Sequence, residues 1–152
     1  MSTNEELLIE ELVGTWKLVS MKRIVADTGE IYDPNPDDPP SGLLMYGNDG
    51  RMIVLNLLGG RPKANSPEAI TDEQRDQLFR TMVAYGGTYT FDGHLVSHHI
   101  DISWNECWTG TTQVRSVTRD GEKLVLTATS PARSPVDGKL GRVRMVWERV
   151  TH

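Results

Sequence analysis

Two ionisable residues, His98 and Arg115, stand within largely apolar rows of the segment 84–128. Successive side chains of a β-strand point to opposite faces. One face of the strand around His98 carries Val96, His98, Ile100 and Ile102, and the other carries Ser97, His99, Asp101 and Ser103. We expect the apolar row to face the interior, together with Gln113, Arg115, Val117, Leu124 and Leu126.

These two residues could do acid–base and anion-binding chemistry. The pKa of an imidazole lies near neutrality, so His98 could act as a general acid or base. The Arg115 guanidinium could bind a ligand carboxylate, enolate or phenolate. We expect ligand contacts from Tyr85, Tyr89, His98, Gln113, Arg115 and Trp147, with His98 and Arg115 catalytic only if the protein is an enzyme. The structural alternative is an internal polar network that fixes the strand register without chemistry.

The histidines and the cysteine do not form a metal motif. His98 and His99 are adjacent, so in a regular strand they face opposite sides and cannot share one ion. Cys107 is the single cysteine, which excludes an intrachain disulfide and a cysteine cluster. Motifs of serine hydrolases, phosphate loops and dinucleotide folds are absent. We therefore predict no metal and no cofactor.

Two Asp-Gly pairs define the strands that position the candidate residues. Asp92-Gly93 and Asp120-Gly121 are typical of type I′ hairpin turns, in which both central residues need positive φ. These turns and the longer connection 104–110 predict pairs of Tyr89 with Val96, Gly87 with His98, His98 with Arg115, and Arg115 with Leu126. A slip of one residue would turn the whole inner row outward.

The rest of the chain reads as short strands, two helices and polar loops. Strands are expected at 14–20, 22–26, 43–46, 52–57 and 142–150. Helices are expected over 3–12, with a Thr3–Glu6 capping box, and from Thr71 through Val83, ended by Gly86-Gly87. Loops are expected at 32–41, 59–67 and 130–141.

About nine or ten strands with local connections predict a mainly β fold in one domain, residues 1–152. We predict an antiparallel up-and-down β-barrel of about 8–10 strands with one or two short helices, because closure removes exposed edges. An eight-stranded barrel has room for one small ligand. Methionines suit an adaptable lining, and the candidates are Met45, Met52, Met82 and Met145.

Composition limits the possible partners. The net charge of −5 and the lack of a basic stripe argue against nucleic-acid binding. The acidic N-terminal segment lacks an apolar signal core, and no apolar run is long enough to span a membrane. We expect a cytoplasmic protein, and the sequence leaves the oligomeric state open.

Several segments, in order along the chain, resemble the lipocalin-like domain family. They are Leu12–Ser20 with its Gly14-Thr15-Trp16, Gly42–Tyr46 with Asp49–Met52, Ala84–Thr90, Val96–His99, Gly110–Arg115 and Val146–Val150. The resemblance implies a small calycin-type barrel with a central cavity. It also implies that Trp16 plugs the closed end and that Arg149 packs across it. The missing signal-peptide pattern and cysteine pair depart from secreted lipocalins.

Three functions are compatible with these residues. The first is binding of a small apolar or aromatic molecule with a polar or anionic end. The second uses the same cavity for a cofactor-independent cyclase, isomerase or hydrolyase reaction of a natural-product pathway. The third is a protein without a small ligand that acts through a surface at Trp104 and Trp108, residues that could instead form the rim of a cavity mouth.

Overall fold

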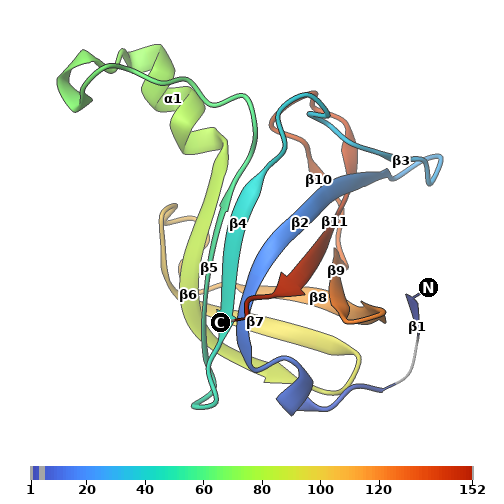
Figure 1. The fold of residues 1–152 in the computed structure, drawn as a ribbon. Coiled ribbons are helices and arrows are strands. Elements are labelled where there is room, and N and C mark those ends of the chain that lie inside the picture. Colours follow the sequence, from blue (N-terminus) through green and yellow to red (C-terminus); the bar gives the residue numbers. More distant parts are fainter. Residues whose placement is uncertain (1, 4–5, 152) are drawn as a thin grey trace.

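The computed structural model describes residues 2–3 and 6–151 and shows a closed antiparallel β-barrel of eight strands (Figure 1). Successive barrel strands pair with each other, and the last pairs with the first. The strands are β2 (Gly14–Val25), β4 (Ser41–Tyr46), β5 (Arg51–Leu57), β6 (Met82–Phe91), β7 (Leu95–Ser103), β8 (Thr112–Asp120), β9 (Lys123–Ala128) and β11 (Leu140–Arg149). The mainly β, up-and-down barrel predicted from the sequence is confirmed.

Short elements flank the barrel. β1 (Ser2–Thr3), β3 (Ile31–Tyr32) and β10 (Ala132–Arg133) pair with β8, β2 and β11, and η1 (Ile9–Glu11) and η2 (Pro67–Ala69) are single 3₁₀ turns. Helix α1 (Asp72–Arg80) lies toward the same end of the barrel as β3 and β10 (Figure 1). In the part of the chain that the structure describes, no helix has the length and apolarity to cross a membrane.

The helix expected over residues 3–12 is wrong. Residue 3 lies in β1, and helical geometry within the described part of that range is limited to η1. Leu7 and Leu12 on either side of η1 are buried in the barrel core, so packing overrides the local helical pattern. The structure does not describe residues 4 and 5 or the Thr3 side chain. The capping box expected at Thr3 and Glu6 therefore lies outside the described part of the chain.

The helix expected from Thr71 is confirmed at its start and wrong at its end. The Thr71 hydroxyl accepts a hydrogen bond from the Gln74 N–H, and the Gln74 side chain accepts one from the Thr71 N–H. Met82 already begins β6, and Gly86-Gly87 lie inside that strand. A Cβ at Gly87 would collide with the backbone carbonyl of His99, so this glycine permits close approach of β6 and β7.

In both hairpin turns glycine occupies the first of the two central positions, whereas the sequence predicted it at the second. The strand register is therefore shifted by two residues from the prediction. Asp92 N–H donates to the Leu95 carbonyl, so Gly93 begins the central pair and Phe91 lies opposite Val96. Among the described residues, only glycines have positive φ, which fits type II′ turns with glycine at the first central position. The predicted type I′ turns would also require a positive φ at the aspartate before each glycine. The predicted pairs are wrong by two residues. The predicted faces are kept, because two is the side-chain period of a strand.

A β-bulge in β7 reverses the alternation near its end. Ile100 and Ile102 pair with the adjacent residues Gly87 and Gly86, so Asp101 is the extra residue. Ile100 is buried, as predicted, but Ile102 is 68% exposed. The inward orientation expected for Ile102 is therefore wrong, because the bulge turns the residues beyond it to the opposite face.

A second bulge lies within β2, which is one strand where two were expected. Leu18 and Ser20 pair with the adjacent residues Trp147 and Val146, so Val19 is the extra residue. Beyond the bulge the buried side chains are Met21 and Arg23, on the opposite parity to Trp16 and Leu18. The bulge thus directs an arginine into the barrel.

Trp16 closes one end of the barrel. Its side chain is buried, and its indole N–H donates to the Leu12 carbonyl at 2.8 Å. The Arg149 guanidinium lies 4.3 Å from the centre of the Trp16 ring, and it donates to the carbonyls of Val13 and Glu11. The Trp–Arg stack implied by the resemblance is present, and its polar atoms are paired within the closed end.

Candidate functional site

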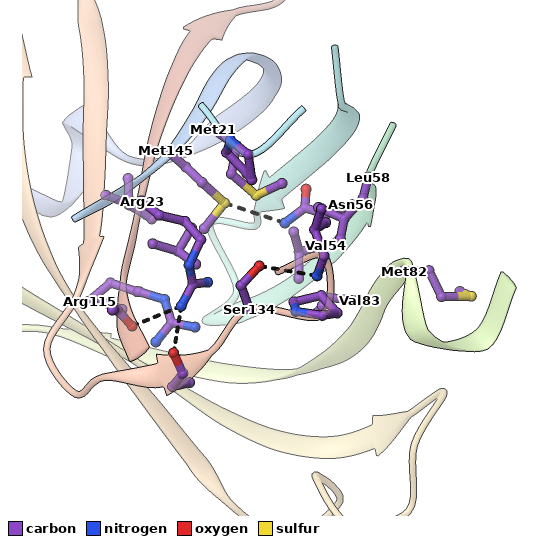
Figure 2. Close-up of a pocket in the computed structure, with 18 of the residues that line it drawn as sticks. Met21, Arg23, Val54, Asn56, Leu58, Met82, Val83, Arg115, Ser134 and Met145 are labelled. Atoms are coloured by element: carbon purple, nitrogen blue, oxygen red, sulfur yellow. Dashed lines mark hydrogen bonds between the residues drawn. The ribbon is translucent and has the colours of Figure 1, made fainter. Parts of the chain in front are cut away.

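The other half of the barrel encloses a cavity of about 240 Å³ (Figure 2). Every barrel strand contributes to its wall, through Met21, Leu44, Val54, Tyr85, His98, Arg115, Leu126 and Met145. Most of these side chains are apolar, and a few polar groups stand among them. This composition is typical of a site for a small molecule.

Two tyrosine hydroxyls hold the His98 ring in this wall. The Tyr46 oxygen lies 2.6 Å from His98 Nε2, and the Tyr85 oxygen lies 2.6 Å from His98 Nδ1. All three side chains are buried, at 1%, 3% and 6% exposure for Tyr46, His98 and Tyr85. Tyr85 and His98 line the cavity, whereas Tyr46 does not. We call these residues the Tyr–His–Tyr triad.

The buried position of Tyr46 fixes the direction of the hydrogen bonds in the triad. A neutral imidazole has one donor nitrogen and one acceptor nitrogen. If Nε2 carried the hydrogen, the Tyr46 hydroxyl hydrogen would have no acceptor among the described residues, which costs about 1–3 kcal/mol for a buried donor. Tyr46 therefore donates to Nε2, and His98 Nδ1–H donates to the Tyr85 oxygen. The Tyr85 hydroxyl hydrogen is left to donate into the cavity.

The triad is neutral at pH 7. Burial, followed by the charges of Arg115 and His99, lowers the pKa of His98 to about 3. Burial raises the pKa of Tyr85 to about 12 and raises the pKa of Tyr46 well above its usual range. The near-neutral pKa expected for His98 is therefore wrong, because desolvation and a neighbouring cation both oppose protonation. At neutral pH the triad offers hydrogen bonds rather than a base.

Arg115 lies diagonally across from His98 on the inner surface. It pairs with Val96 and Ala128, and not with His98 and Leu126 as predicted. The side chain lines the cavity, and its hydrogen bond within the protein runs from Nη1 to the Val114 carbonyl at 3.0 Å. Among the described residues, no carboxylate lies within ion-pair distance of Arg115.

Arg23 is a second cation in the wall, and it extends into the same pocket as Arg115 (Figure 2). It is only 5% exposed, and its Nη2 donates to the carbonyls of Ala132 and Gly141 at 2.5 and 3.0 Å. Its Nε has no hydrogen-bond partner among the described residues, and the same holds for the indole nitrogen of Trp147. Buried donors of this kind are rare in proteins and need a partner.

Sequence reasoning missed Arg23 and Tyr46. Simple alternation from Trp16 assigns Arg23 to the outside, and the signal for its true orientation was the three-residue spacing from Leu18 to Met21. The strand holding Tyr46 was predicted, but its inner face was left open because the turn after it was not assigned. The structure places Tyr46 inside.

Two residues predicted to contact a ligand lie outside the cavity wall. Tyr89 is buried below it, packs on Tyr46 at 4.7 Å between ring centres, and donates to the Gly47 carbonyl at 2.8 Å. Gln113 faces the interior side of β8 but has its Nε2 3.4 Å from the Thr111 hydroxyl. Met45, expected in the lining, is 48% exposed on the outer surface. Tyr85, His98, Arg115 and Trp147 do line the cavity.

Aromatic side chains connect the cavity wall to helix α1. Trp108 lines the cavity, with its ring centre 5.7 Å from that of Tyr85 and 5.2 Å from that of Trp104. The Trp104 indole N–H donates to the Phe79 carbonyl in α1 at 3.1 Å. The two tryptophans therefore tie the helix to the wall.

Comparison with known families now bears on this barrel. The sequence model of the lipocalin-like domain matches residues 13–150. The chain belongs to the lipocalin-like domain family. No curated protein matches the chain. Membership agrees with the closed barrel, the Trp16 plug and the internal cavity, and a lipocalin-like barrel of this kind is suited to binding a small molecule.

Proposed function

We propose that this lipocalin-like protein binds one small, largely apolar molecule, aromatic in character, whose polar end accepts a hydrogen bond from Tyr85. The Tyr–His–Tyr triad carries the proposal, because its geometry leaves the Tyr85 hydroxyl hydrogen directed at the cavity. A carbonyl, hydroxyl or carboxylate oxygen would supply the acceptor.

Apolar residues around this donor support an apolar ligand body. The wall around Tyr85 includes Leu44, Val54, Leu126 and Met145, and all four are buried. Such a ligand would gain about 25 cal/mol for each Å² of apolar surface that it buries. The aromatic rings of Trp108 and Trp147 would stack on a planar ligand.

A cyclase, isomerase or hydrolyase in the same cavity has weaker support. That chemistry would use His98 as acid or base and Arg115 as the stabiliser of an oxyanion. The pKa of His98, lowered to about 3 by burial, makes the ring a poor base at neutral pH. The two tyrosines also fill both nitrogens of the ring. Binding is therefore the function that the geometry supports best.

The test uses naphthyl methyl ketone, a neutral aromatic probe whose polar atom is only an acceptor. Binding is followed by quenching of tryptophan fluorescence in the wild type, in Tyr85→Phe and in Tyr32→Phe. Tyr32 is a matched control because it bonds to Asp137 and lies outside the cavity wall. We expect Tyr85→Phe to weaken binding about three- to tenfold, the worth of one neutral hydrogen bond, and Tyr32→Phe to leave it unchanged.

Two results would contradict binding at this site. One is the absence of any quenching by the ketone, and the other is equal affinity of the wild type and Tyr85→Phe. A separate incubation of the protein with extract from its host, followed by mass spectrometry, distinguishes the enzyme. Retention of an unchanged compound supports binding, whereas release of an isomer or of a hydrated or dehydrated product supports catalysis.

A further inference from the structure

We propose that the polar end of the ligand is an anion of the carboxylate type, which neutralises Arg23 and Arg115. This inference rests on the proposed function and adds the charge of the ligand to it. Two observations on the described residues support it: the cavity wall contains arginines but no acidic side chain, and Arg23 and Arg115 have no counterion in the protein.

The described residues that line the cavity carry positive charge without any acidic side chain. The charged members are Arg23, Arg80, Arg115 and Arg133. Arg80 forms an ion pair with Asp76 at 2.8 Å on the exposed side of α1, and Arg133 is exposed and donates to the Gly138 carbonyl. Arg133 has no carboxylate partner among the described residues either, but water solvates its charge, so the cations that need a counterion are Arg23 and Arg115.

Arg23 is the stronger indication, because its charge is almost fully removed from water. The carbonyls of Ala132 and Gly141 orient the guanidinium, yet they leave its charge uncompensated and its Nε without a partner. A buried charge without a counterion is costly in a protein interior. An anionic ligand would supply the missing counterion.

Arg115 places a second positive charge beside the triad. On the inner surface it lies diagonally from His98, whose Nδ1 is bonded to Tyr85. A carboxylate near this point could accept one hydrogen bond from the Tyr85 hydroxyl and others from the planar guanidinium fork. A neutral acceptor would use Tyr85 but leave the arginine charges unbalanced.

The unpaired polar atoms of the residues that line the cavity also match an anion. The unpaired atoms of Arg23 and Trp147 are donors, and the Tyr85 hydroxyl hydrogen is a further donor. The unpaired acceptor among the lining residues, Asn56 Oδ1, is packed against Gly42 of β4. A site that presents donors and positive charge selects negatively charged oxygen atoms.

The test compares naphthoate with naphthyl methyl ketone, which have nearly the same shape and differ in charge. Affinities of the wild type, Arg115→Met, Arg115→Lys and Arg142→Met are measured by tryptophan quenching. Arg142 is the matched control, since it alternates with the lining residues Gly141 and Val143 and is itself absent from the wall. Arg23→Met is added as the variant that removes the more buried charge.

We expect the wild type to bind naphthoate at least tenfold more tightly than the ketone. Arg115→Met and Arg23→Met should each reduce this preference severalfold while ketone affinity changes little, and Arg115→Lys should keep part of it because the charge remains. Arg142→Met should behave as the wild type does. If Arg23→Met fails to fold, the Arg115 variants still decide the outcome.

Equal wild-type affinities for the two probes would overturn the anion proposal, and so would a preference for naphthoate that survives in both methionine variants. In either case ketone binding that depends on Tyr85 would leave the proposed function standing. Failure of both probes to bind would overturn the proposed function and the anion proposal together.

Discussion

The two ends of the barrel use the same residue types in opposite ways. At the closed end, the indole N–H of Trp16 donates to the Leu12 carbonyl, and Arg149 stacks on the ring while donating to two carbonyls. In the cavity, the indole nitrogen of Trp147 has no partner among the described residues, and Arg115 has a single carbonyl contact. The protein itself supplies hydrogen-bond acceptors for the Trp16–Arg149 set at the closed end, but it leaves a donor of the set in the cavity without a partner among the described residues.

This contrast separates residues that stabilise the fold from residues that await a ligand. A satisfied buried polar group contributes to stability, whereas an unsatisfied one costs free energy until something binds it. The identity of a residue does not decide between these roles. The number of its hydrogen-bonding atoms that the protein itself pairs does decide.

The largest expected difference between the ends concerns their tryptophans. Trp16→Ala should lower the free energy of unfolding by about 3–5 kcal/mol, because it empties a fully buried site. Trp108→Ala, at the half-buried cavity wall, should cost about 1 kcal/mol. Urea unfolding followed by circular dichroism measures both. Equal losses would show that the cavity end is as important to stability as the closed end.

The second-largest expected effect is a pH dependence of the free energy of unfolding that arises from His98 in the cavity wall. Below its ordinary pKa of 6.5, this histidine is protonated in the unfolded chain, but folded His98 stays neutral until the pH reaches about 3. Protons therefore favour the unfolded state, and the free energy of unfolding should fall by roughly 1 kcal/mol per pH unit from about pH 6.5 to about 4.5. Urea titrations at each pH should show a shallower dependence in His98→Gln. An unchanged slope in His98→Gln would contradict the buried neutral ring, and exposed His94→Gln is the control.

A smaller effect divides the triad itself. Tyr46→Phe leaves His98 Nε2 without a partner in a dry position, so it should cost about 1–3 kcal/mol of unfolding free energy. Tyr85→Phe should cost less than about 1 kcal/mol, because water in the cavity can accept from Nδ1. The comparison again uses urea unfolding. The opposite ranking would reverse the assigned hydrogen-bond directions.

The smallest expected effect is the difference in unfolding free energy between variants of Arg149 at the closed end and Arg115 in the cavity. Arg149→Met should lower the free energy of unfolding by about 1 kcal/mol through loss of the stack on the Trp16 ring and of its carbonyl contacts. Arg115→Met should leave it unchanged or raise it slightly, because it removes a cation without a carboxylate partner from an apolar cavity. Thermal and urea unfolding measure both variants. A clear loss in Arg115→Met would indicate that this arginine stabilises the fold.

Alternation predicted the faces of the site strands well, and turn chemistry predicted their register poorly. Val96, His98, Ile100 and Val117 are buried as expected, because the apolar pattern is strong on β7 and β8. The register slipped by two residues because Gly93 occupies the first central position of its turn. A slip of two keeps every face, so the prediction of His98 and Arg115 inside survived the wrong pairing.

The predictions that were wrong or missing concern features that depend on contacts between segments distant in the sequence. Ile102 points outward because of the bulge at Asp101, and no local pattern in β7 signals an extra residue there. Tyr46 joins His98 from 52 residues away, so its role appears only when the barrel closes. The depressed pKa of His98 likewise follows from burial and from the Arg115 charge.

The extra residue Val19 lets a single strand serve two independent purposes. Before it, β2 supplies Trp16 to the plug, and after it the same strand supplies Arg23 to the cavity. Without a bulge at Val19, simple alternation from Trp16 and Leu18 would turn Ser20 and Lys22 to the interior and Arg23 to the outside. A single out-of-phase residue in one strand therefore sets which side chains reach the cavity, independently of those that form the closed end.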